Sequence, residues 1–169
     1  LDARRQPGSA FKPFVYAAPL SAGYTPVSLV DDVPVEIQID DRIWRPANYG
    51  HEYTGRVTLR TALAKSSNVA AVRVSRAVGE ARVVSLAQHN GIVSTLLPVP
   101  AIALGALEVT PVELVAAYAP FANGGFRVTP HLISRIETAN GDAIWNVTAT
   151  REDVLDARAI RNASPMPTI

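Results

Sequence analysis

Ser9 and Lys12 are the residues of this chain whose types and spacing most directly suggest chemistry. They form an S-x-x-K tetrapeptide that follows Pro7 and Gly8, and an apolar run typical of a helix begins within it. Residues three positions apart share one face of a helix, so we expect the Ser9 hydroxyl and the Lys12 amine to meet. A lysine whose pKa is lowered by desolvation is a base that can activate a serine hydroxyl. The pair therefore predicts a serine nucleophile with a lysine general base.

The element predicted to position this pair is a helix over residues 9–22, ended by Gly23. Ser9 is expected at or near its N-cap, where a hydroxyl accepts a bond from a backbone N–H. The N–H groups of a helix N-terminus are also suited to hold a developing oxyanion. The alternative is a serine that only caps a helix, followed by a solvated lysine, and an isolated S-x-x-K match usually has that meaning.

A second motif changes this balance. The chain has two lysines, and the other one, Lys65, directly precedes the triplet Ser66-Ser67-Asn68. This S-x-N triplet is predicted either to interrupt a helix or to lie between two helices. S-x-x-K followed by S-x-N, in that order, is the motif set of penicillin-recognising serine enzymes.

On these motifs and the text around them, the chain resembles the transpeptidase domain of class A, bifunctional penicillin-binding proteins. The resemblance covers roughly residues 1–150, and its matching stretches are residues 4–14, 44–49, 57–68, 103–111 and 117–125. It implies a peptidoglycan D,D-transpeptidase that cross-links peptide stems through a serine acyl-enzyme and that β-lactam antibiotics inhibit covalently. It implies Ser9 as the nucleophile, Lys12 as the acylation base, Ser66 as a proton relay to the leaving amine, and Asn68 as the partner of the substrate amide carbonyl.

The chain also departs from that family. The third family motif, K-[ST]-G on a strand beside the active site, is absent, since neither lysine is followed by Thr-Gly or Ser-Gly. We therefore expect an excerpt of a larger protein, with the opening strands, the glycosyltransferase domain and any membrane anchor outside it. Residues 151–169 are atypical and are expected to form a mobile tail.

The missing strand leads to an expectation about Lys12. Without that strand, one wall of the active-site cleft would be missing. Water would then reach the Lys12 amine, and its pKa would stay near the reference value of about 10.4. The isolated chain would then be inactive, and stable only as a homo-oligomer or beside the missing segments.

Two other classes of function stay open from the sequence. The missing third motif favours a non-catalytic interaction module that keeps the penicillin-binding fold. A serine β-lactamase or D,D-carboxypeptidase is disfavoured, because the S-x-N triplet has no central Asp. The location that the resemblance implies is the bacterial cell envelope, on the outer, periplasmic face of the cytoplasmic membrane.

Composition excludes several further classes of function. Of 169 residues, 48% are hydrophobic and 18% are charged, which indicates a folded core of about one domain. A net charge of +1 gives no electrostatic case for nucleic acid. The absence of cysteine excludes thiol catalysis and Cys-ligated zinc, and no cofactor or metal is implied. The pairs Asp31-Asp32 and Asp40-Asp41 are interpreted as solvated turn residues rather than a catalytic dyad or a calcium site.

The elements around the motifs are predicted to be mainly α-helical with short β-hairpins, as part of an α+β fold of the penicillin-binding and serine β-lactamase type. Further helices are predicted at residues 58–64, 69–78, 80–90, 110–122 and 153–160. Strands are predicted at residues 33–39 and 42–44, and at 126–138 and 143–147 around Asn140-Gly141. The stretches 25–32 and 46–55 are predicted to be surface loops.

Overall fold

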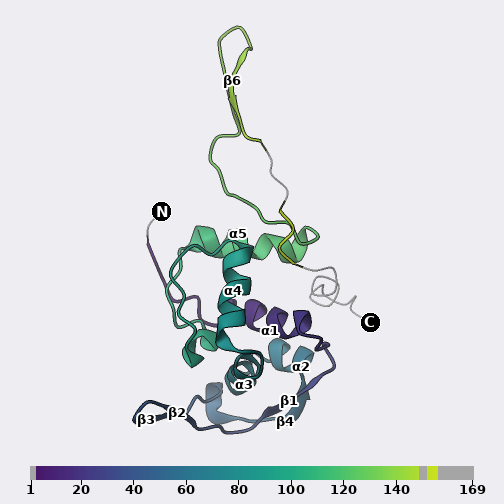
Figure 1. The fold of residues 1–169 in the computed structure, drawn as a ribbon, viewed down its shortest axis with the longest axis vertical. Coiled ribbons are helices and arrows are strands. Elements are labelled where there is room, and N and C mark those ends of the chain that lie inside the picture. The colour runs from purple at the N-terminus through teal and green to yellow at the C-terminus, as the bar shows by residue number, and fades with distance from the viewer. Residues whose placement is uncertain (1–2, 149–151, 156–169) are drawn as a thin grey trace.

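The computed structural model describes residues 3–148 and 152–155, and Figure 1 shows their arrangement. The prediction of a mainly helical chain with short hairpins is confirmed. The helices are α1 (Lys12–Ser21), α2 (Leu59–Ala64), α3 (Asn68–Val78), α4 (Glu80–Asn90) and α5 (Pro111–Ala122). The strands are β1 (Leu29–Asp32), β2 (Ile37–Ile39), β3 (Arg42–Trp44), β4 (Gly55–Thr58), β5 (Arg135–Glu137) and β6 (Ala143–Asn146). Among the described residues they form antiparallel pairs, β1 with β4, β2 with β3, and β5 with β6.

Helix α1 is the centre of the helical body and is buried on nearly every side. Phe14, Val15 and Ala18 have no exposed surface, and the helix packs against α2, α3 and α4. A helix that is apolar all round belongs in a core. Helix α5 covers it through aromatic contacts, with the ring of Phe14 centred 5.6 Å from Tyr118 and 5.5 Å from Phe121. The segment that begins with Lys12 is therefore held inside the molecule.

The S-x-N triplet lies between two helices, one of the two predicted arrangements. Thr58 caps α2 by accepting a hydrogen bond from the Thr61 N–H, and Ser67 caps α3 by accepting one from the Ala70 N–H. Asn68 is the first residue of α3. The break between the helices comes at Ser66, whose φ of +54° no continuous α-helix accommodates.

The pairing of β1 with β4 was not predicted from the sequence. Leu29 lies opposite Thr58 and Asp32 opposite Gly55. The β1 stretch was predicted to be a surface loop, and β4 joins the end of a predicted loop to a predicted helix. Short strands of this kind are formed by contacts with a distant partner, which local patterns do not reveal. The predicted strand over residues 33–39 is shorter than expected, although its antiparallel pairing with β3 was foreseen.

The β5–β6 hairpin projects away from the helical body (Figure 1). Its turn contains Gly141 at a φ of +89°, as the Asn-Gly signal indicated. In the predicted helix over 153–160, Asp153 instead forms an isolated bridge with Phe126, and residues 156–160 lie outside the described residues. The predicted mobile tail also lies largely outside them, but Leu155 is buried against the body.

Candidate active site

Ser9 lies in a 3₁₀ turn, Gly8–Phe11, directly before α1. Ser9 was predicted at or near the N-cap, and it lies two residues after the actual N-cap, Pro7; no side chain caps the turn. Pro7 has a helical backbone conformation, which lets the turn begin one residue earlier than expected. The Ser9 side chain is exposed, so its hydroxyl can be reached from solvent.

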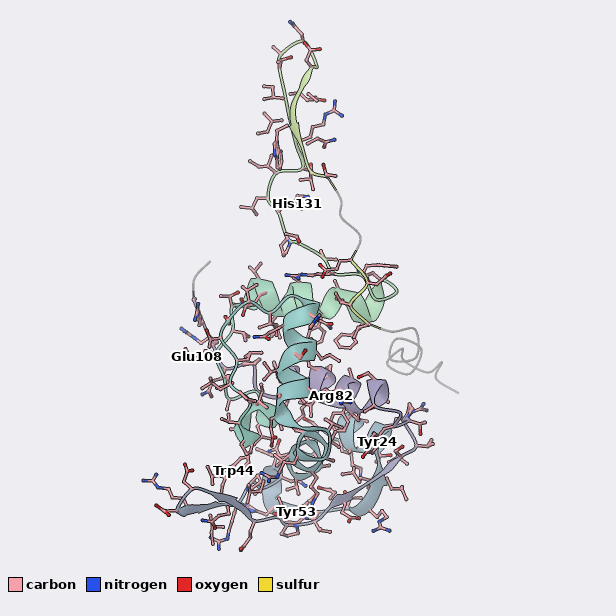
Figure 2. The ribbon with its side chains drawn as sticks, in the orientation of Figure 1. Tyr24, Trp44, Tyr53, Arg82, Glu108 and His131 are labelled. Carbon is pink, nitrogen blue, oxygen red and sulfur yellow. The ribbon has the colours of Figure 1, made fainter. Side chains whose placement is uncertain are left out.

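The segment around residues 105–109 holds this turn in place. The Gly8 N–H donates to the Gly105 carbonyl at 3.1 Å, and Arg5 and Val109 exchange two backbone hydrogen bonds of 3.0 Å. Gly105 has a φ of +64°, and a Cβ added there would lie 2.2 Å from the Gly8 carbonyl oxygen. Glu108, labelled in Figure 2, marks this segment on the side of the body where the N-terminal stretch runs. Sequence reasoning missed this contact, although a glycine at each side of it was the available signal.

Lys12 is enclosed, with 1% of its surface exposed. Its Nζ donates to the Ser66 carbonyl oxygen at 2.5 Å, to the Ser66 Oγ at 3.0 Å and to the Asn68 Oδ1 at 2.7 Å. Among the described residues, no carboxylate lies within ion-pair distance of it. Burial without a counter-charge lowers the pKa of Lys12 to about 8. The expectation of a solvated Lys12 with an ordinary pKa is therefore wrong, because α1 and the 66–68 turn enclose the amine.

Ser66 stands between the two residues of the first motif. Its Oγ donates to the Ser9 Oγ at 3.1 Å and accepts from Lys12 Nζ. Within the described part of the chain, Lys12 Nζ makes all its hydrogen bonds to the 66–68 turn and none to Ser9. The expectation that Ser9 and Lys12 meet directly is thus corrected. The amine points across to a segment that is distant in sequence, and spacing along one helix could not show this.

The side-chain amide of Asn68 forms hydrogen bonds through both its oxygen and its nitrogen. Its Oδ1 accepts from Lys12, and its Nδ2 donates to the Ala47 carbonyl oxygen at 2.9 Å. A side-chain amide carries two N–H bonds, and the bond to the Ala47 carbonyl uses one of them. The structure brings Ser9, Lys12, Ser66 and Asn68 together, as the sequence motifs predicted.

Asp32 is a residue of this region that sequence reasoning misinterpreted. It is 3% exposed, and its Oδ1 accepts from Ser67 Oγ and from Asn48 Nδ2, both at 2.7 Å. Its Oδ2 accepts from the Thr54 N–H at 3.0 Å. Burial opposes ionisation, but these hydrogen bonds outweigh it and hold the pKa of Asp32 below its ordinary value. Asp32 is therefore a buried anchor rather than a solvated turn residue.

The arrangement links three groups that could move a proton. An exposed hydroxyl adjoins a second hydroxyl, which adjoins a buried amine of lowered pKa. Across residues 3–148 and 152–155 there is no cluster of three His, Cys, Asp or Glu side chains of the kind that holds a metal. The helices of those same residues include none that is long and apolar enough to cross a membrane.

Comparison with known families gives a match over nearly the whole chain. Residues 1–166 match the family model of the penicillin-binding protein transpeptidase domain. Penicillin-binding protein 1A of Pseudomonas aeruginosa is 40% identical over 158 residues, which are 91% of this chain and 19% of that protein. Penicillin-binding protein 2D of Bacillus subtilis is 38% identical over 161 residues, 94% of this chain and 23% of that protein. The chain thus spans about a fifth of the length of these curated relatives.

Solved structures give a similar result. The crystal structure of penicillin-binding protein 1A from Haemophilus influenzae superposes with a TM-score of 0.81 at 34% identity, over 91% of this chain and 23% of that one. The PonA1 protein of Mycobacterium tuberculosis in complex with penicillin V superposes with a TM-score of 0.85 at 25% identity, over 95% of this chain and 46% of that one. The sequence motifs, the fold and the comparisons all point to one family.

Proposed function

Because this chain belongs to the penicillin-binding protein transpeptidase domain family, we propose that it supplies the nucleophile and the base of a peptidoglycan D,D-transpeptidase. The observation that carries the proposal is the continuous set of contacts from Ser9 through Ser66 to the buried Lys12. The substrate class is a peptide stem that ends in D-Ala-D-Ala, as the family resemblance implies.

The reaction follows from the order of these groups. Once Lys12 is neutral, the Ser66 hydroxyl turns its proton from Ser9 toward Lys12 Nζ and can accept from Ser9. Ser9 Oγ then attacks the carbonyl carbon of the penultimate D-alanine, and its proton passes through Ser66 Oγ to Lys12. The C–N bond then breaks, the proton returns through Ser66 to the leaving amine, and D-alanine departs. An amine of a neighbouring stem attacks the Ser9 ester in the second half, forms the cross-link and restores the hydroxyl.

The electrostatics of Lys12 suit this role. With a pKa of about 8, the amine is neutral in about a tenth of molecules at pH 7, against well under a thousandth for a solvated lysine. Asn68 holds the amine through Oδ1 and offers its remaining N–H to the substrate amide carbonyl. Positioning and proton transfer are thus provided by the same 66–68 turn.

β-Lactams are expected to acylate the same serine, because the carbonyl of their strained amide takes the place of the carbonyl of the penultimate D-alanine. The PonA1 neighbour was solved in complex with penicillin V, which supports this expectation for a related fold. The substrate places the whole protein in the bacterial cell envelope, on the outer face of the cytoplasmic membrane, where peptidoglycan is assembled.

The 169-residue chain alone is expected to be catalytically silent. Its sequence has no K-[ST]-G motif, and the family uses that strand to hold the substrate carboxylate. The reason lies in substrate binding rather than in Lys12, which is buried without that strand. Rapid acylation of the monomeric chain by penicillin would contradict this expectation. The partners expected for this chain are a second copy of it or the remaining segments of the same protein.

Acylation by a fluorescent penicillin tests the proposed function. The longer protein that contains this chain is incubated with the probe, its mass increase is measured, and the labelled peptide is sequenced. We expect one adduct, on Ser9, that disappears in Ser9→Ala. An adduct on Ser66 or Ser67 would overturn the assignment of roles, and a failure of the longer protein to label at all would favour a non-catalytic module.

A further inference from the structure

We propose that Asp32 is a positioning residue for the acylation step: through Ser67 and Asn48 it fixes the 66–68 turn, so that Ser66 and Asn68 face Lys12. The inference rests on the proposed function, in which Ser9 is the nucleophile. It concerns a residue that lies on β1, outside both sequence motifs.

The carboxylate of Asp32 is turned inward by the register of β1. Neighbouring residues of a strand point to opposite faces, and here Asp31 faces solvent and pairs with Arg56 at 2.9 Å. Asp32 faces the body and receives hydrogen bonds from Ser67, Asn48 and Thr54. A buried carboxylate is stable only when it is paired or hydrogen-bonded, so these contacts keep the charge in place.

Asn48 transmits the constraint to the start of α3. Its Oδ1 accepts from the backbone N–H groups of Asn68 at 2.8 Å and Val69 at 3.1 Å. These are N–H groups that a helix terminus leaves without an internal partner. The Asn48 amide can serve them only with its oxygen turned toward α3, and the bonds from its Nδ2 to Asp32 Oδ1 at 2.7 Å and to the Glu52 carbonyl oxygen at 2.9 Å select that orientation.

Ser67 transmits the same constraint directly. Its hydroxyl accepts from the Ala70 N–H at 3.0 Å and donates to Asp32 Oδ1 at 2.7 Å, with Asn48 Oδ1 as a second, longer acceptor at 3.2 Å. The preceding residue, Ser66, has a φ of +54°, a left-handed conformation that costs a residue with a Cβ roughly 1–2 kcal/mol. That conformation turns the Ser66 carbonyl and hydroxyl toward Lys12, and the bonds to Asp32 hold the residues that follow it.

Asp32→Asn and Asp31→Asn form a matched pair that tests the inference. The asparagine keeps the shape of the side chain but replaces one acceptor oxygen by an N–H₂ group. That group then faces either the Thr54 N–H or the donors of Asn48 and Ser67. Both variants are made in the longer protein, and acylation by fluorescent penicillin is followed at several concentrations. This separates the dissociation constant of the initial complex from the first-order acylation rate constant, and the end point gives the fraction of molecules that label.

For Asp32→Asn we expect the acylation rate constant to fall by about 10- to 100-fold, as a misplacement of order 1 Å would give. The dissociation constant should change less than the rate constant, because Asn68 supplies only one of the contacts that bind the probe. The labelled fraction stays unchanged, and Asp31→Asn retains all three values. Ser67→Ala reproduces the loss, Ser67→Thr restores the rate, and the Asp32→Asn/Ser67→Ala double variant is no slower than the slower single one.

Other outcomes would overturn the inference. A lower labelled fraction with an unchanged rate constant would show that Asp32 only stabilises the fold. Equal rate constants for Asp32→Asn and the unmutated protein would exclude any part in positioning while leaving the role of Ser9 intact. An unmutated protein that fails to label on Ser9 would overturn the proposed function itself, and that result does not depend on Asp32.

Discussion

The Ser66 Oγ lies 3.1 Å from the Ser9 Oγ, although 57 positions separate the two residues in the sequence. The same Ser66 oxygen accepts a hydrogen bond from Lys12 at 3.0 Å. Ser66 is therefore the group that connects the nucleophile to the buried amine. In the proposed reaction this relationship, rather than the i,i+3 spacing of Ser9 and Lys12, provides the route by which a proton leaves Ser9.

Removal of the Ser66 hydroxyl should interrupt the proton path. General-base assistance contributes typically about 10²–10⁴ in rate, so Ser66→Ala and Ser66→Gly are expected to slow penicillin acylation by about 10²-fold or more. Glycine accepts the left-handed backbone of residue 66 without strain, so Ser66→Gly separates the hydroxyl from the conformation. Nearly equal losses in both variants, read by stopped-flow fluorescence, would assign the effect to the hydroxyl. Acylation at the unmutated rate in Ser66→Gly would show that the proton takes another route.

The two lysines of the chain give a second contrast. Lys12→Ala should slow acylation by about 10²–10⁴-fold, because it removes the base. Lys65 is exposed, and within the described residues its side chain makes one long hydrogen bond, of 3.4 Å, to Thr54. Lys65→Ala should therefore leave the rate within about twofold of the unmutated protein, as a surface substitution does. Small and equal effects of the two substitutions would remove Lys12 from the mechanism.

The rate of acylation should depend on pH through Lys12. Burial lowers its pKa to about 8, and in the proposed reaction the neutral amine is the base. Below that pKa the rate should fall about tenfold for each unit of pH, and above it the rate should level off. The measurement is the acylation rate constant of the longer protein from pH 6 to pH 9.5, with the labelled fraction recorded at each pH. A profile without a rise near pH 8 would mean that another group limits the step.

Gly105 should be intolerant of a side chain because of its contact with Gly8. Alanine there carries the cost of a positive φ, about 1–2 kcal/mol, and its Cβ would also overlap the Gly8 backbone. We expect Gly105→Ala to lower the midpoint of thermal unfolding and to slow acylation by displacing the turn that carries Ser9. Gly141 is the control, since its φ is +89° but nothing lies within 4 Å of an added Cβ. Similar acylation rates for Gly105→Ala and Gly141→Ala would show that the contact does not position the turn.

Local signals in the sequence determined much of the chain. The S-x-x-K and S-x-N motifs identified all four candidate site residues. The caps Thr58 and Thr110 placed the starts of α2 and α5, and both accept the expected backbone N–H bonds. The Asn-Gly pair placed the β5–β6 hairpin. Each of these signals depends on residues within a few positions of one another, so the pattern is complete without the rest of the fold.

Only the tertiary structure determined the burial and the hydrogen-bond partners of the site residues. The burial of Lys12, and with it the lowered pKa, depends on the 66–68 turn that lies across from α1. The inward turn of Asp32 depends on the pairing of β1 with β4, which neither strand shows by itself. Desolvation and the choice of hydrogen-bond partner are set by whichever segments close around a group, and spacing along the chain does not contain that information.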